Sequence, residues 1–243
     1  MTIGCCAVVV MGAFVSAMAR PAPPALKRIS AFETSLKGRI GAQRHNAQLA
    51  LSKLNGYEVG PGKTFSFNSV VGTWSRDQGY KKAPISYNGQ LISSWGGGVC
   101  QTSTTLYNAA LLAGMEITER NPHRFAPSYV QPGRDAAVAF SNIDLRFRNP
   151  HTFPVKIIGS IENEMLRVEF LSATPLGEKP LIVSELRRVH APATFVLAGG
   201  STSKYRNTGK SGYETATYRV VGGKRELLSV DSYPVMNRIL EFR

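Results

Sequence analysis

The residue of this sequence that is best suited to catalysis is a cysteine at the start of an expected helix. Cys100 follows three glycines and a valine in "GGGVCQTSTTLYNAALLAGM", and helix-like spacing begins directly after it. The unpaired N–H groups and the positive dipole end of a helix N-terminus stabilise negative charge. A thiolate is the reactive form of cysteine, and this placement lowers the pKa of a thiol. The position therefore favours a nucleophilic role for Cys100.

A thiol nucleophile normally works with a histidine, and the histidine works with a group that orients it. His123 follows the expected helix by one connection, and Asp135 and Asp144 lie on or near the strands expected next. His151, in a second Arg-Asn-Pro-His string, competes with His123 for the role of base. The predicted catalytic set is therefore Cys100 as nucleophile, His123 as base, and Asp135 or Asp144 as the orienting acid.

The residues beside the thiol complete the expected site. Glycines 96–98 permit positive φ and let the main chain of a substrate approach the sulfur. The backbone N–H of Cys100 or Gln101 is placed to stabilise an oxyanion, so Gln101 joins the catalytic set. No spacing of Cys, His or acidic residues indicates a metal site, and no metal or other cofactor is expected.

Each of these residues also has a purely structural interpretation. A cysteine before an Ala- and Leu-rich helix is often a small buried apolar residue. Asp135 lies in "PGRD", which is a typical turn sequence. Asp144 and Arg146 have the spacing of a surface ion pair of little energetic value. Both interpretations stay open on the residues alone.

The N-terminal segment predicts an exported protein. Residues 1–19, "MTIGCCAVVVMGAFVSAMA", are uncharged and apolar, and they end in a small-x-small site before a Pro-rich stretch. This pattern is typical of a secretory signal peptide, or of an uncleaved N-terminal anchor. Cys5 and Cys6 lie within it, so its removal leaves Cys100 without an internal disulfide partner.

The charge of the chain points to an anionic partner at the cell surface. The sequence has 29 Lys and Arg against 16 Asp and Glu, a net charge of +13. Peptidoglycan or another anionic wall polymer is the expected partner, and membrane contact is expected only through an uncleaved N-terminal segment. Nucleic acid is not expected, because no helix-turn-helix or RNP-like aromatic pattern accompanies the charge. A basic surface that only keeps the protein soluble is the alternative.

The periodicity of the chain predicts an α+β fold. Helices are expected over residues 39–54 and from Cys100 to about Ala113, and a hairpin is expected over 80–95 around Asn88-Gly89. Strands are expected at 56–72 and from Met115 to residue 171. We predict an N-terminal helix, a central Cys-bearing helix packed on an antiparallel sheet in a papain- or transglutaminase-like layout, and a β-rich C-terminal extension. The expected segments are 1–19 (signal peptide or anchor), 20–30 (linker), 31–172 (main domain) and 173–243 (β-rich extension).

Several strings resemble one protein family. "PGKTFSFNSVVG", "GGGVCQTSTTLYNAALLAGMEITERNPH", "YVQPGRDAAVAF" and "DLRFRN" occur here in the order found in the VanW family. The resemblance covers about residues 30–172, and it implies a bacterial envelope protein connected with glycopeptide resistance or peptidoglycan, without a settled activity. The family motif falls on Gly96, Gly97, Gly98, Cys100, Gln101, Ser103, Thr104, Thr105, His123, Arg134 and Asp135. Among these, the three glycines, Ser103, Thr104 and Arg134 are expected to bind substrate.

Two hypotheses of function follow. The first is a cysteine-dependent transpeptidase or hydrolase that acts on peptidoglycan stem peptides. The second is a non-catalytic wall-binding or scaffolding module, in which the glycine loop holds an anionic group and Cys100 only packs. The position of His123 and His151 relative to the thiol bears directly on the choice, because a base must lie within hydrogen-bond reach of its nucleophile.

Overall fold

The computed structural model describes residues 24–87, 90–140, 142–197, 199–200 and 202–242. The expected signal segment with Cys5 and Cys6 lies outside the described residues, as does the expected Asn88-Gly89 turn. Among the described residues, no helix is both long and apolar enough to cross a bilayer.

The described helices are short and few. They are α1 (Gly41–Leu54), α2 (Phe67–Val71), a 3-10 turn (Arg76–Gln78) and α3 (Val99–Leu112). The strands before residue 173 are β1 (Lys27–Ser35), β2 (Glu58–Val59), β3 (Thr64–Ser66), β4 (Lys82–Tyr87), β5 (Gln90–Trp95), β6 (Glu116–Glu119), β7 (Arg146–Arg148), β8 (Val155–Glu162) and β9 (Met165–Ser172). The later strands are β10 (Leu181–His190), β11 (Thr194–Leu197), β12 (Ser203–Asn207), β13 (Gly212–Val221), β14 (Lys224–Tyr233) and β15 (Arg238–Phe242).

The expected α+β class with a papain- or transglutaminase-like layout is wrong. Strands make up 45% of the structure and helices 17%, and the strands form several small sheets, so the protein is mostly β. One reason for the wrong prediction is strand β1, which begins inside the stretch predicted as a linker. It pairs with β9, which lies at the far end of the domain. Such long-range pairing leaves little local signal in the sequence.

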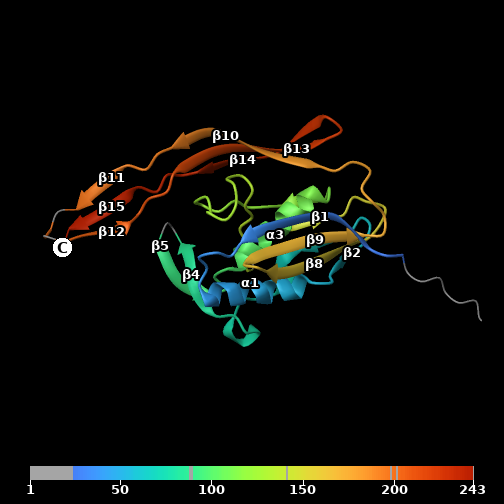
Figure 1. Cartoon of the computed structure of the whole chain (residues 1–243), viewed down its shortest axis with the longest axis horizontal. Helices are drawn as coiled ribbons and strands as arrows, with labels where there is room; N and C mark the ends of the chain where they lie inside the picture. The colour runs from blue at the N-terminus through green and yellow to red at the C-terminus, as the bar shows by residue number, and fades with distance from the viewer. Residues whose placement is uncertain (1–23, 88–89, 141, 198, 201, 243) are drawn as a thin grey trace, which may run out of the picture.

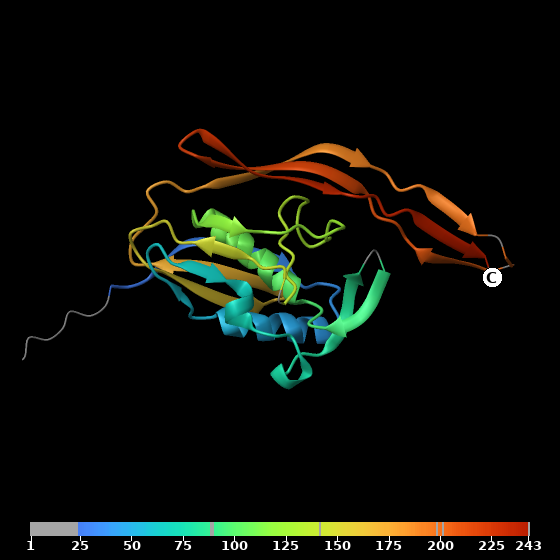
Figure 2. The same cartoon turned by 180° about the vertical axis from the view of Figure 1, so that it is seen from behind.

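The central sheet has the order β1-β9-β8-β2 and carries α1 and α3 on one face (Figures 1 and 2). Helix α3 packs on β1 and β9, and α1 packs on β8 and α3. A second small sheet, β3-β7-β6, joins the same core through the stacked rings of Phe65 and Phe147, whose centroids lie 4.6 Å apart. Phe147 in turn meets Phe170 of the central sheet at 5.8 Å.

Some predictions of individual helices and strands are confirmed, and others are wrong. The two main helices are confirmed, with α1 ending at Leu54 and capped by Asn55, and with Gly114 at φ +74° following the end of α3. The hairpin strands are confirmed as the antiparallel pair β4-β5. The strand predictions over 126–130, 135–140 and 142–145 are wrong, because these residues form turns, irregular segments and isolated bridges. Phe67 begins α2 instead of continuing the strand of Phe65, because Ser66 caps that helix by accepting the N–H of Ser69.

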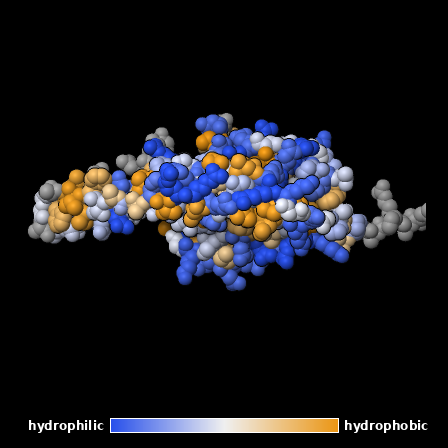
Figure 3. Space-filling model, turned by 90° about the horizontal axis from the view of Figure 1, so that it is seen from above, coloured by the Kyte–Doolittle hydropathy of each residue, from blue (hydrophilic) through white to orange (hydrophobic). Residues whose placement is uncertain are grey.

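The C-terminal strands form two three-stranded sheets that follow one another along the molecule. The sheet β10-β13-β14 lies over α3, and β11-β15-β12 continues from it as an arm beyond the body (Figures 1 and 2). Apolar side chains gather on the arm in the space-filling view (Figure 3), and those of Phe195, Val196, Leu197 and Tyr205 are exposed.

The contact between α1 and the central sheet requires a glycine in β8. A Cβ added at Gly159 would lie 2.5 Å from Leu51 Cδ1 of α1. We expect Gly159→Ala to lower the free energy of unfolding by about 1–3 kcal/mol, because the tightly packed interface has to shift. Gly177→Ala is the control, since its Cβ meets nothing within 4 Å, and it should change stability by less than about 0.5 kcal/mol. Denaturant unfolding of the three proteins measures both, and equal stabilities would contradict this view of the interface.

Candidate functional site

The glycine run lets the start of α3 press against two other elements. Gly98 precedes the helix at φ +112°, and a Cβ there would lie 2.3 Å from the carbonyl oxygen of Gln43 in α1. A Cβ at Gly97 would lie 2.9 Å from the carbonyl oxygens of Ala83 and Pro84 in β4. Only glycine fits such close backbone approaches. The run therefore fixes the N-terminus of α3, with Cys100 as its second residue.

The Cys100 thiol lies between the two segments that follow α3. Cys100 is free and partly buried, its Sγ lies 3.4 Å from the carbonyl oxygen of Val138, and His123 lies close enough to lower the pKa of the thiol. The His123 side chain is 24% exposed. The thiol and the imidazole therefore lie near the protein surface, at the positive end of the α3 dipole.

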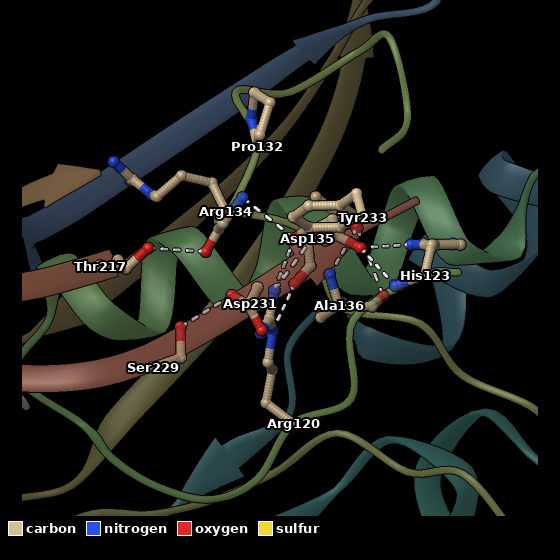
Figure 4. A network of polar contacts seen from close by, with 12 residues as sticks. Arg120, His123, Pro132, Arg134, Asp135, Ala136, Thr217, Ser229, Asp231 and Tyr233 are labelled. Carbon is tan, nitrogen blue, oxygen red and sulfur yellow. Dashed lines mark hydrogen bonds and ion pairs between the residues drawn. The ribbon is translucent and has the colours of Figure 1, made fainter. Parts of the chain in front are cut away.

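His123 is oriented by Asp135 through main chain and side chain. Asn121 and Ala137 form an isolated antiparallel bridge, and this register places His123 opposite Asp135. The Asp135 Oδ2 atom accepts the His123 backbone N–H at 2.7 Å and lies 2.6 Å from Nδ1 of the ring (Figure 4). Because Asp135 holds Nδ1, Nε2 is the ring nitrogen available to the thiol.

The Asp135 carboxylate is fully buried, and a cation lies against it. The Arg120 guanidinium donates to the Asp135 carbonyl oxygen at 2.6 Å and to Oδ1 at 3.1 Å. Burial alone would raise the pKa of Asp135, but the hydrogen bond and charge of His123 and the charge of Arg120 lower it below its ordinary value. The carboxylate therefore stays ionised.

The same interactions favour an ion pair between thiol and imidazole. Burial opposes ionisation of Cys100, yet the hydrogen bond and positive charge of His123 outweigh it and lower the pKa of the thiol. Burial likewise opposes charging of His123, yet its hydrogen bonds to Asp135 and Cys100 raise its pKa to about 10. With the pKa of the thiol lowered and that of the imidazole raised, the pair favours a thiolate beside an imidazolium, which is the arrangement of an activated thiol nucleophile.

Two other predicted residues lie away from the thiol. Asp144 accepts the Ser66 hydroxyl at 2.5 Å and the Asn68 N–H at 2.9 Å, so it holds the start of α2. His151 lies at the opposite end of α3, where Nε2 is 2.9 Å from the Ala113 carbonyl oxygen. The structure brings together Cys100, His123 and Asp135, and it brings neither Asp144 nor His151 to them.

The remaining predicted residues tie α3 to its neighbours. The Gln101 side chain accepts from Arg39 at 2.9 Å and donates to the Ser35 carbonyl oxygen at 2.8 Å, and its backbone N–H donates to Gly98. The Ser103 hydroxyl donates to the Ala136 carbonyl oxygen at 2.7 Å, and the Thr104 hydroxyl accepts the Ala136 N–H at 3.0 Å. These two bonds anchor the segment that carries Asp135.

Arg134 belongs to the same anchoring arrangement. Its Nε donates to Asn108 Oδ1 of α3 at 2.6 Å, and its guanidinium lies over the ring of Phe32. Thr105 bonds to Thr34 of β1 at 2.8 Å. The polar side chains of α3 are thus buried and satisfied by the elements around the helix.

Sequence reasoning missed Arg120 and Tyr129. The Tyr129 hydroxyl is hydrogen-bonded to Thr104, and burial together with the nearby charge of Cys100 raises its pKa, so it stays protonated beside the thiol. Arg39 lies over its ring at 5.1 Å. Neither residue has a local pattern that marks it, because their partners come from other segments. Among the described residues, no group of three or more Cys, His or acidic side chains is arranged to hold a metal ion.

The matched family segment includes the three residues at the thiol. Residues 42–171, which include Cys100, His123 and Asp135, match the family model described as VanW like protein. The chain belongs to the VanW family. A curated relative is the "Uncharacterized protein YoaR" of Bacillus subtilis (strain 168), 43% identical over 129 residues, or 53% of this chain and 41% of that protein.

A second curated relative carries a name that refers to resistance. The "Vancomycin B-type resistance protein VanW" of Enterococcus faecalis (strain ATCC 700802 / V583) is 32% identical over 127 residues, or 50% of this chain and 46% of that protein. The aligned part of the chain spans less than half the length of either relative.

Two solved structures match parts of the chain at low similarity. The IgA1 protease G5 domain matches 28% of this chain and 92% of its own length at a TM-score of 0.20 and 18% identity. The structure HP0197-G5 matches 27% of this chain and 95% of its own length at a TM-score of 0.17 and 24% identity. At these scores the matches carry no conclusion about this chain.

The ion pair predicts how Cys100 reacts with an alkylating reagent. In the wild-type chain, the pH midpoint of Cys100 alkylation should lie below the ordinary thiol value of about 8.5. His123→Ala removes the cation that stabilises the thiolate, so the midpoint should rise by about one to three pH units. Mass spectrometry of the Cys100 peptide separates its signal from Cys5 and Cys6. Equal midpoints in the two proteins would contradict the ion pair.

Substitution of Asp135 should change the pH midpoint of Cys100 alkylation, whereas substitution of Asp144 should not. Asp135→Asn removes the anion that holds the His123 proton, so the pKa of His123 should fall from about 10 toward about 6.5 and the Cys100 midpoint should rise. Asp144→Asn should leave that midpoint unchanged and cost about 1 kcal/mol of stability through the α2 cap. Alkylation profiles and thermal unfolding distinguish the two, and a shifted midpoint in Asp144→Asn would overturn the assignment.

Proposed function

We propose that this VanW-family protein is a cysteine-dependent acyl-transfer enzyme, a transpeptidase or hydrolase of peptidoglycan stem peptides. The observation that carries the proposal is the arrangement of Cys100, His123 and Asp135, in which Asp135 Oδ2 lies 2.6 Å from His123 Nδ1 and His123 lowers the pKa of the thiol. A cysteine that only packs in a core needs neither an imidazole at its sulfur nor a buried carboxylate behind that imidazole. A buried carboxylate is costly to retain, which favours a chemical role.

The proposed reaction proceeds in two steps. The Cys100 thiolate attacks the carbonyl carbon of an amide, and the His123 imidazolium transfers its proton to the departing amine, which leaves a thioester on Cys100. An incoming amine or water then attacks the thioester, neutral His123 accepts the proton of that nucleophile, and Cys100 leaves as thiolate. An amine yields a cross-link and water yields a trimmed peptide. In this proposal the positive dipole end of α3 stabilises the oxyanion formed in each step.

The proposed place of action is the bacterial cell envelope. The apolar N-terminal segment supports export. The net charge of +13 supports residence beside anionic wall polymers, which attract a basic protein over several ångströms. The name of the enterococcal relative supports a connection with glycopeptide resistance or wall maintenance.

The experiment compares peptidoglycan from cells that express the wild-type chain, Cys100→Ala or Asp144→Asn. Muropeptide analysis should show new cross-links or trimmed stems with the wild-type chain and with Asp144→Asn. These products should be lost by at least about a hundredfold in Cys100→Ala, because a thiol nucleophile has no substitute in this site. Identical muropeptides from the wild-type and Cys100→Ala strains would refute the enzyme.

A non-catalytic wall-binding or scaffolding module is the second candidate, and the strongly basic charge favours it. Neither curated relative has a name that states an enzymatic activity. In this candidate the glycine loop holds an anion and Cys100 only packs. The faces of Gly97 and Gly98 are closed by backbone carbonyl oxygens, which repel anions. Full function and wall retention in Cys100→Ser, with loss of retention when exposed basic residues are reversed, would favour this module.

A further inference from the structure

The Asp135 carboxylate is also bound by a residue from the C-terminal sheet. Tyr233 is the last residue of β14, and its side chain is 1% exposed. Its hydroxyl donates to Asp135 Oδ1 at 2.5 Å and accepts the backbone N–H of Gly133 at 3.0 Å (Figure 4). One hydroxyl therefore holds both the carboxylate and the backbone two residues before it.

A second residue of β14 acts on the same carboxylate through Arg120. The Arg120 guanidinium lies between two buried acids, with Nη1 2.5 Å from Asp231 Oδ1 and Nη2 3.1 Å from Asp135 Oδ1. Asp231 is held in turn by the Ser229 hydroxyl at 2.9 Å. Because two carboxylates share this cation, Asp135 is not fully neutralised by Arg120 and keeps negative charge for His123.

The loop that carries Asp135 is docked on the C-terminal sheet along its length. The Ser184 hydroxyl of β10 donates to the Pro132 carbonyl oxygen at 2.6 Å, and the Thr217 hydroxyl of β13 donates to the Gly133 carbonyl oxygen at 3.0 Å. A Cβ at Gly133 would lie 2.6 Å from Thr217 Oγ1, so the loop and sheet are in close contact.

We propose that the C-terminal sheet β10-β13-β14 is part of the active site, with Tyr233 and Asp231 as positioning residues that present Asp135 Oδ2 to His123. The inference rests on the proposed function. It adds that the reactive thiol depends on residues outside the segment 42–171 that defines the family match. Neither residue touches the thiol, and both act through Asp135.

Tyr233 matters because the Asp135 carboxylate lies between two cations, and its orientation decides how strongly it binds each of them. Asp135 has His123 at one oxygen and Arg120 at the other. The Tyr233 hydroxyl fixes the rotation of the carboxylate between them, because a donor at Oδ1 leaves Oδ2 directed at Nδ1. Without that donor the carboxylate turns toward Arg120, its hold on the imidazolium weakens, and the thiolate loses its counter-charge. Tyr107 lies under Arg120, and Tyr129 lies beside Cys100. The guanidinium groups of Arg39 and Arg134 lie near Tyr129 and Tyr107, respectively.

The test uses the full chain and two matched tyrosine variants. Tyr233→Phe removes the hydroxyl and keeps the buried ring. Tyr213→Phe removes a hydroxyl from the directly paired position of β13 and is the control. The readout is the pH profile of Cys100 alkylation by iodoacetamide, which needs no substrate and which a merely structural residue would not move. Thermal unfolding checks that each variant is folded.

The expected result is a profile shifted to higher pH in Tyr233→Phe alone. Alkylation at neutral pH should be slower by about tenfold, the factor that the loss of one hydrogen bond to a charged group corresponds to. Asp231→Asn is a second variant that leaves Tyr233 in place, and it should shift the profile in the same direction because Arg120 then pairs with Asp135 alone.

Each other outcome overturns a distinct claim. A depressed midpoint in the wild-type chain that Tyr233→Phe and Asp231→Asn both leave unchanged refutes the role of the C-terminal sheet and leaves the proposed enzyme standing. An ordinary thiol profile in the wild-type chain refutes the activated thiol and the positioning role together. An equal shift in Tyr213→Phe shows a general effect of the sheet on the fold and refutes the specific contact.

Discussion

The structure depends on one buried negative charge. An isolated carboxylate in a protein interior costs several kcal/mol or takes up a proton. Asp135 avoids both outcomes because it accepts from the backbone and ring of His123, from Arg120 and from Tyr233. These donors come from the segment after β6 and from β14, so the charge is stable only when both parts of the chain are folded together.

The thiol is placed by a different kind of constraint. Gly97 and Gly98 have no side chains, so the start of α3 lies against the backbones of α1 and β4. The polar residues of α3 then bind the Asp135 segment, through Ser103 and Thr104 to Ala136. Steric fit thus positions Cys100, and hydrogen bonds position the acid. In the proposed mechanism, His123 joins the two.

The local features around Cys100 have signals in the sequence, and the roles assigned to these residues stay predictions. The glycine run, the helix that contains Cys100 and the nearby His123 have short-range signals in composition and spacing. The choice between Asp135 and Asp144 had no such signal, because it depends on an isolated bridge between Asn121 and Ala137. The fold class failed for a related reason. Many of the strands pair with distant segments, as β1 does with β9, and Tyr233 meets Asp135 from almost one hundred residues away.

The titration of the His123 ring tests the central claim most directly. Nuclear magnetic resonance of ring-labelled histidine, assigned with His123→Ala, reports the protonation state of that imidazole at each pH. The account predicts that His123 stays protonated at neutral pH and loses its proton near pH 10. It also predicts that this value falls in Cys100→Ser, which removes the thiolate. A ring that titrates near the ordinary value of about 6.5, unchanged by Cys100→Ser, would contradict the account.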